Sequence, residues 1–184
     1  YVEKEDFAIL FDNYLLSSPC NKIYKTSIIK DNDIRFDEKI SYAEDLVFNL
    51  QYFRHISCVR MIPAATYHYI KYPTSSTGRF HLNTAYTLGK IEIEAAKTIT
   101  NPTEDSKLIF LKHIMWGLVN ISNTKSPLSS REATNEIRRI LRLPTYDTSL
   151  TALHRLGINK ILGLLLRLKS ANLIYQALHH RFSK

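Results

Sequence analysis

Residues 41–50 read SYAEDLVFNL and place two adjacent carboxylates, Glu44 and Asp45, at the start of a predicted helix. Ser41 and Glu44 match the capping-box pattern S-x-x-E, in which the two side chains satisfy backbone N–H groups of the first turn. Apolar side chains then recur on one helical face, at Leu46, Val47, Leu50 and Phe53. The stretch therefore predicts a helix from Ser41 to about Arg54, with Asp45 away from its apolar face.

Asp45 is the residue of this stretch that capping does not explain. An acidic side chain in a first helical turn is favourable because it faces the positive end of the helix dipole. A catalytic general base also needs a carboxylate that is fixed in place and partly shielded from water. The spacing alone favours the first interpretation and leaves the second open.

The positive charge of the chain is concentrated in its second part. The 184 residues carry a net charge of +8, with 9 Lys/Arg against 10 Asp/Glu in residues 1–78, and 16 against 7 in residues 79–184. Such a segment attracts polyanions, either nucleic acid or anionic lipid. Because no helix-turn-helix, RNP or finger pattern is present, specific nucleic-acid binding is not expected. The longest apolar run, ILGLLL at 161–166, is too short to span a bilayer.

The pattern of the whole chain predicts an α+β fold that is mainly α. Residues 1–78 are predicted as a small α/β part, with helices over about 3–16, 26–30 and 41–54 and strands over 57–63 and 65–72. The Pro/Ser/Thr/Gly loop 73–78 is the predicted domain boundary. Residues 79–184 are predicted as a basic α-helical domain, with helices over about 80–100, 104–122, 129–141, 148–156 and 158–181. The last of these is amphipathic and basic, so it would either dock on its neighbours or lie on an anionic membrane surface.

The sequence predicts no metal site within this chain. Cys20 and Cys58 have no CxxC spacing and are interpreted as buried thiols of a reducing compartment, with residues 20–25 as a buried segment. The 7 histidines form no HxxxH or HExxH pattern. A D-x-D pair is present at Asp31 and Asp33, but no apolar strand precedes it, and it is interpreted as a polar turn.

Four segments taken together resemble the second half of bacterial family 2 glycosyltransferases. They are NKIYK at 21–25, IRFDE at 34–38, AEDLVFN at 43–49, and YHY at 67–69 with a serine-containing loop behind it. The resemblance extends over residues 18–77. It implies a GT-A fold and an inverting transfer of sugar in the synthesis of capsules and other cell-surface polysaccharides.

The resemblance also implies roles for individual residues. Asp45 corresponds to the catalytic base of the family. The acceptor-binding positions correspond to Glu44, Lys22 and Asn49, and positions near the phosphate or metal correspond to His68, Lys71 and Ser75. Many relatives carry an arginine directly after the Y-x-Y segment, where this chain has Ile70 followed by Lys71.

The implied partners are a nucleotide-sugar donor and a glycan or lipid-linked acceptor, with a divalent Mn or Mg ion as cofactor. The family's nucleotide-binding half, which holds donor and metal, has no counterpart before Glu44. The expectation is therefore an acceptor-side, C-terminal fragment that is inactive alone, belonging to a cytoplasmic enzyme peripheral to the inner face of the membrane. The alternative is a non-catalytic helical interaction module or membrane-surface module.

Overall fold

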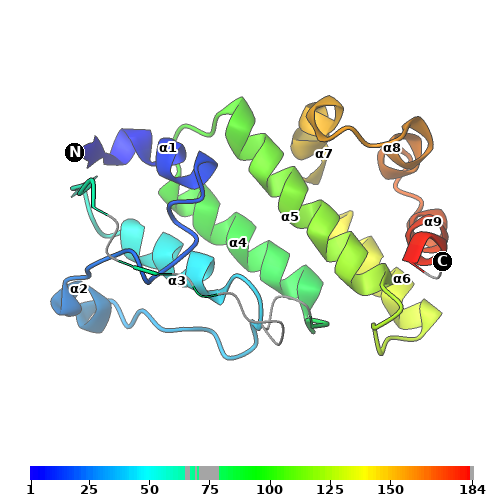
Figure 1. Ribbon diagram of the computed structural model, residues 1–184, viewed down its shortest axis with the longest axis horizontal. Helices are drawn as coiled ribbons and strands as arrows, with labels where there is room; N and C mark the ends of the chain where they lie inside the picture. Colours follow the sequence, from blue (N-terminus) through cyan, green and yellow to red (C-terminus); the bar gives the residue numbers. More distant parts are fainter. Residues whose placement is uncertain (65–66, 69, 71–78, 183–184) are drawn as a thin grey trace. The chain divides into compact units, whose positions relative to one another are not determined.

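The computed structural model describes residues 1–64, 67–68, 70 and 79–182. It divides into two compact units, one formed by 1–79 with 90–103 and the other by 80–89 with 104–184. Helix α4 (Thr84–Thr98) is shared between the units: its residues up to 89 belong to the second unit, and those from 90 onward belong to the first unit. Helices dominate and the described residues pair in one two-stranded sheet (Figure 1), which confirms the predicted α+β, mainly α class.

The first unit opens with a short antiparallel strand pair. β1 (Val2–Glu3) pairs with β2 (Cys58–Val59), so that Val2 lies opposite Val59. The chain continues through the 3-10 turn η1 (Lys4–Asp6), where the Lys4 ammonium donates to the Arg54 carbonyl at 3.0 Å. Three helices complete the unit before α4: α1 (Phe7–Asp12), α2 (Thr26–Asp31) and α3 (Glu44–Phe53).

The core of the first unit forms around α3. The predicted apolar face is confirmed, because its four members are all buried: Leu46, Val47, Leu50 and Phe53. The ring of Phe53 meets Phe7 of α1 edge to face, with centroids 5.2 Å apart. Packing of this kind, rather than helical propensity, stabilises helices as short as α1 and α3.

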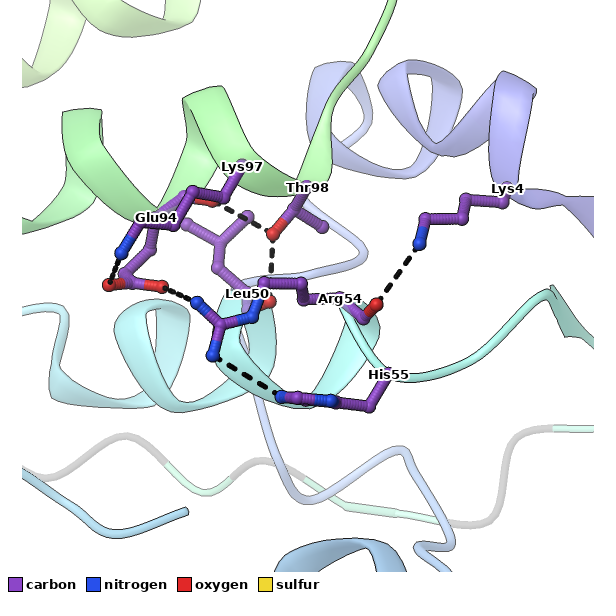
Figure 2. A network of polar contacts seen from close by, with 7 residues as sticks. All are labelled: Lys4, Leu50, Arg54, His55, Glu94, Lys97 and Thr98. Atoms are coloured by element: carbon purple, nitrogen blue, oxygen red, sulfur yellow. Dashed lines mark hydrogen bonds and ion pairs between the residues drawn. The ribbon is translucent and has the colours of Figure 1, made fainter. Parts of the chain in front are cut away.

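A polar network ties the end of α3 to the second part of α4 (Figure 2). The Thr98 hydroxyl donates to the Leu50 carbonyl at 2.9 Å. Beside it, the Glu94 carboxylate is only 6% exposed and lies between Lys97, at 3.2 Å, and Arg54, at 3.6 Å. A buried carboxylate is costly without counter-ions, so these two cations are what stabilise Glu94 in place.

The second unit is a helical assembly centred on α5 (Glu104–Ser122), the longest helix. α5 packs against α6 (Ser130–Ile140), α7 (Tyr146–Ser149), the 3-10 segment η3 (Leu150–Leu156) and α9 (Ala171–Phe182). The helix α8 (Lys160–Arg167) packs on α9. In the part of the chain that the structure describes, no helix is long and apolar enough to cross a membrane.

Two helices of this unit begin at side-chain caps. Ser129 and Glu132 form a reciprocal capping box at the start of α6, and Asn159 accepts from the Leu162 amide at 2.8 Å at the start of α8. Each cap satisfies amides that have no acceptor within their own helix.

The capping box predicted at Ser41 and Glu44 is wrong. α3 begins at Glu44 with Ala43 as its N-cap, and no side chain caps it. Ala43 has a left-handed backbone, with φ of 55°, so the chain enters the helix by a turn that the S-x-x-E pattern does not produce.

The predictions that the two cysteines are buried and that two strands follow α3 also need correction. Cys20 and Cys58 are exposed rather than buried, and Ile23 in the segment 20–25 is exposed as well. The strand predicted over 57–63 is confined to β2. Of the strand predicted over 65–72, the described residues 67, 68 and 70 are not in a strand, and the rest lie outside the described residues.

Helix ends differ from the prediction at both extremes of the chain. The helix expected over 3–16 reduces to η1 and α1, and the one expected over 158–181 is broken between α8 and α9. The break occurs at Lys169, whose φ of 50° ends α8. By contrast, α5 has the bounds that the sequence predicts.

Candidate active site

Asp45 lies in the first turn of α3, where the sequence placed it. Its Oδ1 accepts a hydrogen bond from the Leu46 amide at 2.7 Å, which fixes the carboxylate at the amino end of the helix. The side chain is half-buried, whereas Leu46 beside it belongs to the core. The position therefore combines a fixed carboxylate with partial shielding from water, as a general base requires.

The surroundings raise the pKa of Asp45 above its ordinary value. Burial is the largest cause, and the neighbouring Glu44 carboxylate adds to it. The Leu46 amide and the charge of Lys22 act in the opposite direction by stabilising the ionised form. A carboxylate with a raised pKa is a better proton acceptor near neutral pH than an ordinary aspartate.

Lys22 reaches this site from the segment before α2. Its ammonium donates to the Ser18 carbonyl and to Asn21 Oδ1, the latter at 2.8 Å. Burial lowers the pKa of Lys22 to about 8, while the Asp45 carboxylate acts to raise it. The two side chains thus interact electrostatically, although no direct ion pair between them is seen among the described residues.

The charge of Asp45 acts on two tyrosines that the sequence did not single out, Tyr24 and Tyr42. Burial, with the Asp45 charge as the next cause, raises the pKa of Tyr42 to about 12 and raises that of Tyr24 as well. Both phenols stay protonated at neutral pH, and the Tyr24 hydroxyl donates to Asn49 Oδ1 at 2.6 Å. The signal for Tyr24 was its place in NKIYK, two residues after Lys22, whereas nothing in the sequence marked Tyr42.

The other residues that the sequence predicted for the site differ in their exposure. Glu44 is exposed next to Asp45. Asn49 is fully buried and bonded within the protein, and its predicted contact with an acceptor stays a prediction. His68 is exposed. Lys71 and Ser75 lie outside the described residues.

The D-x-D pair lies at the end of α2 and in the turn that follows it. Asp31 ends α2, and Asp33 follows in a turn with φ of 45°, its carboxylate 2.6 Å from the Arg35 guanidinium. Within the described ranges, no cluster of three or more His, Cys, Asp or Glu side chains is placed to hold a metal ion. The turn interpretation of this pair is confirmed.

A part of the chain is similar to a known glycosyltransferase. A 65-residue segment, 35% of this chain, is 34% identical to the poly(ribitol-phosphate) beta-N-acetylglucosaminyltransferase TarS of Staphylococcus aureus, in strains Mu50 and MW2 alike. The match spans 11% of the length of that enzyme. No family model and no solved structure matches the chain. The similarity supports a relationship to glycosyltransferases.

Proposed function

We propose that the chain is the acceptor-side part of an inverting, family 2 glycosyltransferase of the GT-A type, with Asp45 as its general base. The observation that carries the proposal is the Asp45 carboxylate itself, held in the first turn of α3 with a raised pKa beside Lys22. The resemblance of AEDLVFN to the family and the similarity to a glycosyltransferase support it.

In this reaction Asp45 takes the proton of an acceptor hydroxyl while that oxygen attacks the anomeric carbon of the donor. The new glycosidic bond forms as the bond to the nucleoside diphosphate breaks on the opposite face, which inverts the configuration. The Leu46 amide and, to a lesser extent, the Lys22 charge favour the ionised form of Asp45, which is the form that can take the proton. Tyr24 and Tyr42 both stay protonated and do not compete with Asp45 as bases, and the Tyr24 hydroxyl donates to Asn49 Oδ1.

The donor is proposed to be a nucleotide sugar and the acceptor a glycan or lipid-linked glycan of the cell surface. Because the similar enzyme is an N-acetylglucosaminyltransferase, UDP-N-acetylglucosamine is the first donor to try. The divalent ion of the family is proposed to be held by the nucleotide-binding half of the enzyme and not by this chain alone.

The test compares Asp45→Asn with Glu44→Gln in the enzyme that contains this chain. Transfer from UDP-N-acetylglucosamine with Mn²⁺ should fall by about 10²–10⁴-fold in Asp45→Asn, the usual contribution of a general base. Glu44→Gln removes an exposed neighbouring charge and should keep most of the activity. Equal losses in the two variants, or an active Asp45→Asn, would remove Asp45 from the mechanism.

A calorimetric titration tests the assignment of the donor site. The 184-residue chain alone, with UDP-N-acetylglucosamine and Mn²⁺, should show no tight binding. Micromolar affinity would place the donor site within this chain and contradict the proposal.

A second candidate, a membrane-surface module, has its own supporting observation. α8 and its C-cap Leu168 expose apolar side chains: Ile161 is 72%, Leu164 55% and Leu168 65% exposed. Lys160 and Arg167 lie among them. Such a surface suits the interface of an anionic bilayer. Flotation with phosphatidylglycerol vesicles tests it, and Leu164→Gln should reduce binding. Binding that does not depend on anionic lipid or on Leu164 would contradict it.

A further inference from the structure

A basic cavity lies in the second unit, where the end of α6 meets the start of α9. Its volume is about 390 Å³. Three of the lining residues are cationic and none is acidic; the lining comprises Arg138, Leu141, Arg142, Lys169, Ser170, Ala171 and Asn172. Because no carboxylate lines this hollow, its guanidinium groups give it a positive potential, although Asp147 offsets part of the Lys169 charge.

Arg138 is held in position at this cavity by two amide side chains. Its guanidinium donates to Asn135 Oδ1 at 2.7 Å, on its own helix, and to Asn172 Oδ1 at 3.4 Å, on α9. Both partners are neutral, so the guanidinium keeps its full positive charge. A cation fixed before a ligand arrives loses less side-chain entropy on binding.

Lys169 is placed at the cavity by the turn between α8 and α9. Its amide donates to Leu166 and the next amide, of Ser170, donates to Leu165, the pattern that closes a helix on a left-handed residue. Glycine usually occupies that position, yet here the residue is a lysine with φ of 50°. Its ammonium is fixed by Asp147 at 2.9 Å.

Arg142 and the start of α9 supply the donors that remain available. In the described part of the chain, the exposed guanidinium of Arg142 has no hydrogen-bond or ion-pair partner. α9 begins beside it, with the Ile174 amide bonded to the Ser170 carbonyl. The amides of the preceding turn, which include those of Ala171 and Asn172, have no acceptor in their own helix.

We propose that this cavity binds a phosphate group. Guanidinium groups match phosphate oxygens with paired donors, an ammonium adds charge, and a helix amino end adds amides and a favourable dipole. The group would be a free phosphate or the phosphate of a lipid headgroup, which share this chemistry. The inference is independent of the proposed transferase site, since it uses other residues in the other unit.

The test measures binding of inorganic phosphate to the full chain by calorimetry, at constant ionic strength set with chloride. Arg142→Gln should weaken binding by about tenfold or more, because one charge-assisted donor set is lost. Arg131→Gln is the matched control: it removes the same charge from exposed α6 surface outside the cavity and should change affinity less than about twofold. Unchanged melting temperatures show that both variants fold.

Vesicles of phosphatidylcholine with and without phosphatidylglycerol distinguish the two sources. Binding of phosphatidylglycerol vesicles alone, lost in Arg142→Gln and kept in Arg131→Gln, supports a headgroup site. Binding of inorganic phosphate with the same pattern supports a site for the free anion. Equal losses in the two variants, or no binding of either probe, overturns the proposal.

Discussion

The phenol of Tyr24 donates a 2.6 Å hydrogen bond to Oδ1 of Asn49, which is fully buried in α3. The amide nitrogen of Asn49 donates in turn to the Leu16 carbonyl at 2.6 Å. One side chain therefore joins α3 to two segments that precede it, including the segment that carries Lys22. The proposed base and its neighbouring cation are held together through Asn49.

Replacing Asn49 should destabilise the protein strongly. Asn49→Leu removes both bonds and leaves the Leu16 carbonyl without its partner, so the free energy of unfolding should fall by about 2–4 kcal/mol. Tyr24→Phe removes one bond and should cost about 1 kcal/mol. Urea denaturation measures both. A smaller loss for Asn49→Leu than for Tyr24→Phe would contradict this role.

The pKa of Lys22 should respond to Asp45. The Asp45 carboxylate raises the pKa of Lys22, so Asp45→Asn should lower it further, below about 8. NMR titration of ¹³C-labelled lysine measures the change. An unchanged or higher pKa of Lys22 would show that the two groups do not interact.

The lowered pKa of Lys22 also predicts how the stability of the protein depends on pH. The pKa of Lys22 is lowered by folding from 10.5 to about 8, so between these values the unfolded chain holds more protons than the folded one. Stability from this group therefore rises with pH across that window. Lys22→Met should remove the rise, whereas Lys25→Met, at an exposed neighbouring position, should keep it.

The two counter-ions of Glu94, Arg54 and Lys97, should contribute unequally to the stability of the protein. Arg54→Met leaves this buried carboxylate with Lys97 alone and should cost roughly 1–2 kcal/mol, whereas Lys97→Met, which removes a half-exposed partner, should cost less than about 1 kcal/mol.

Burial and then the Arg54 charge lower the pKa of His55. Arg54→Met should therefore raise it, which NMR titration can verify. A His55 pKa that does not move would contradict the contact.

His113 should make the protein sensitive to acid. The residue as a whole is partly exposed, but both ring nitrogens are shielded from solvent, and burial lowers the pKa of the imidazole from 6.5 to about 4. As pH falls through this window the unfolded chain takes up a proton and the folded chain does not. Stability should fall by up to about 3 kcal/mol. His113→Gln should flatten that part of the pH profile, and an unchanged profile would exclude His113 as its cause.

Two helical glycines should respond oppositely to alanine. A Cβ at Gly117 would lie 2.9 Å from Leu88 and from Thr84, both buried, so Gly117→Ala should destabilise by roughly 1–2 kcal/mol. A Cβ at Gly89 would meet only Leu143, at an ordinary 3.6 Å. Gly89→Ala should gain up to about 1 kcal/mol from helix propensity. Thermal denaturation compares them, and equal shifts would argue against close packing at Gly117.

The periodicity of apolar residues correctly predicted the helices whose stability comes mainly from burial of one apolar face. α5 and the buried face of α3 follow directly from residue spacing, because burial of that face is the main source of their stability. The strand predicted over 57–63 failed because the ladder contains only Cys58 and Val59, paired with the distant β1. Pairing between residues so far apart in the chain produces no pattern in the local sequence.

The candidate site was predictable only in part. Asp45 and Lys22 were found through the family resemblance, but the influence of the Asp45 charge on Tyr24, which lies about twenty residues away in the sequence, depends on the fold. The cavity at Arg142 and Lys169 could not be foreseen either. It depends on a break at Lys169 within a stretch whose apolar spacing predicts one continuous helix.

The left-handed conformation of Ala43 has a consequence for recognising relatives of this chain. The backbone itself, rather than a serine or glutamate side chain, determines where α3 begins. Ser41 and Glu44 could therefore vary among relatives without displacing the aspartate, whereas position 43 would admit glycine or asparagine and reject valine or isoleucine. A sequence profile that weights position 43 and Asp45 above the S-x-x-E pair would then be the more sensitive one.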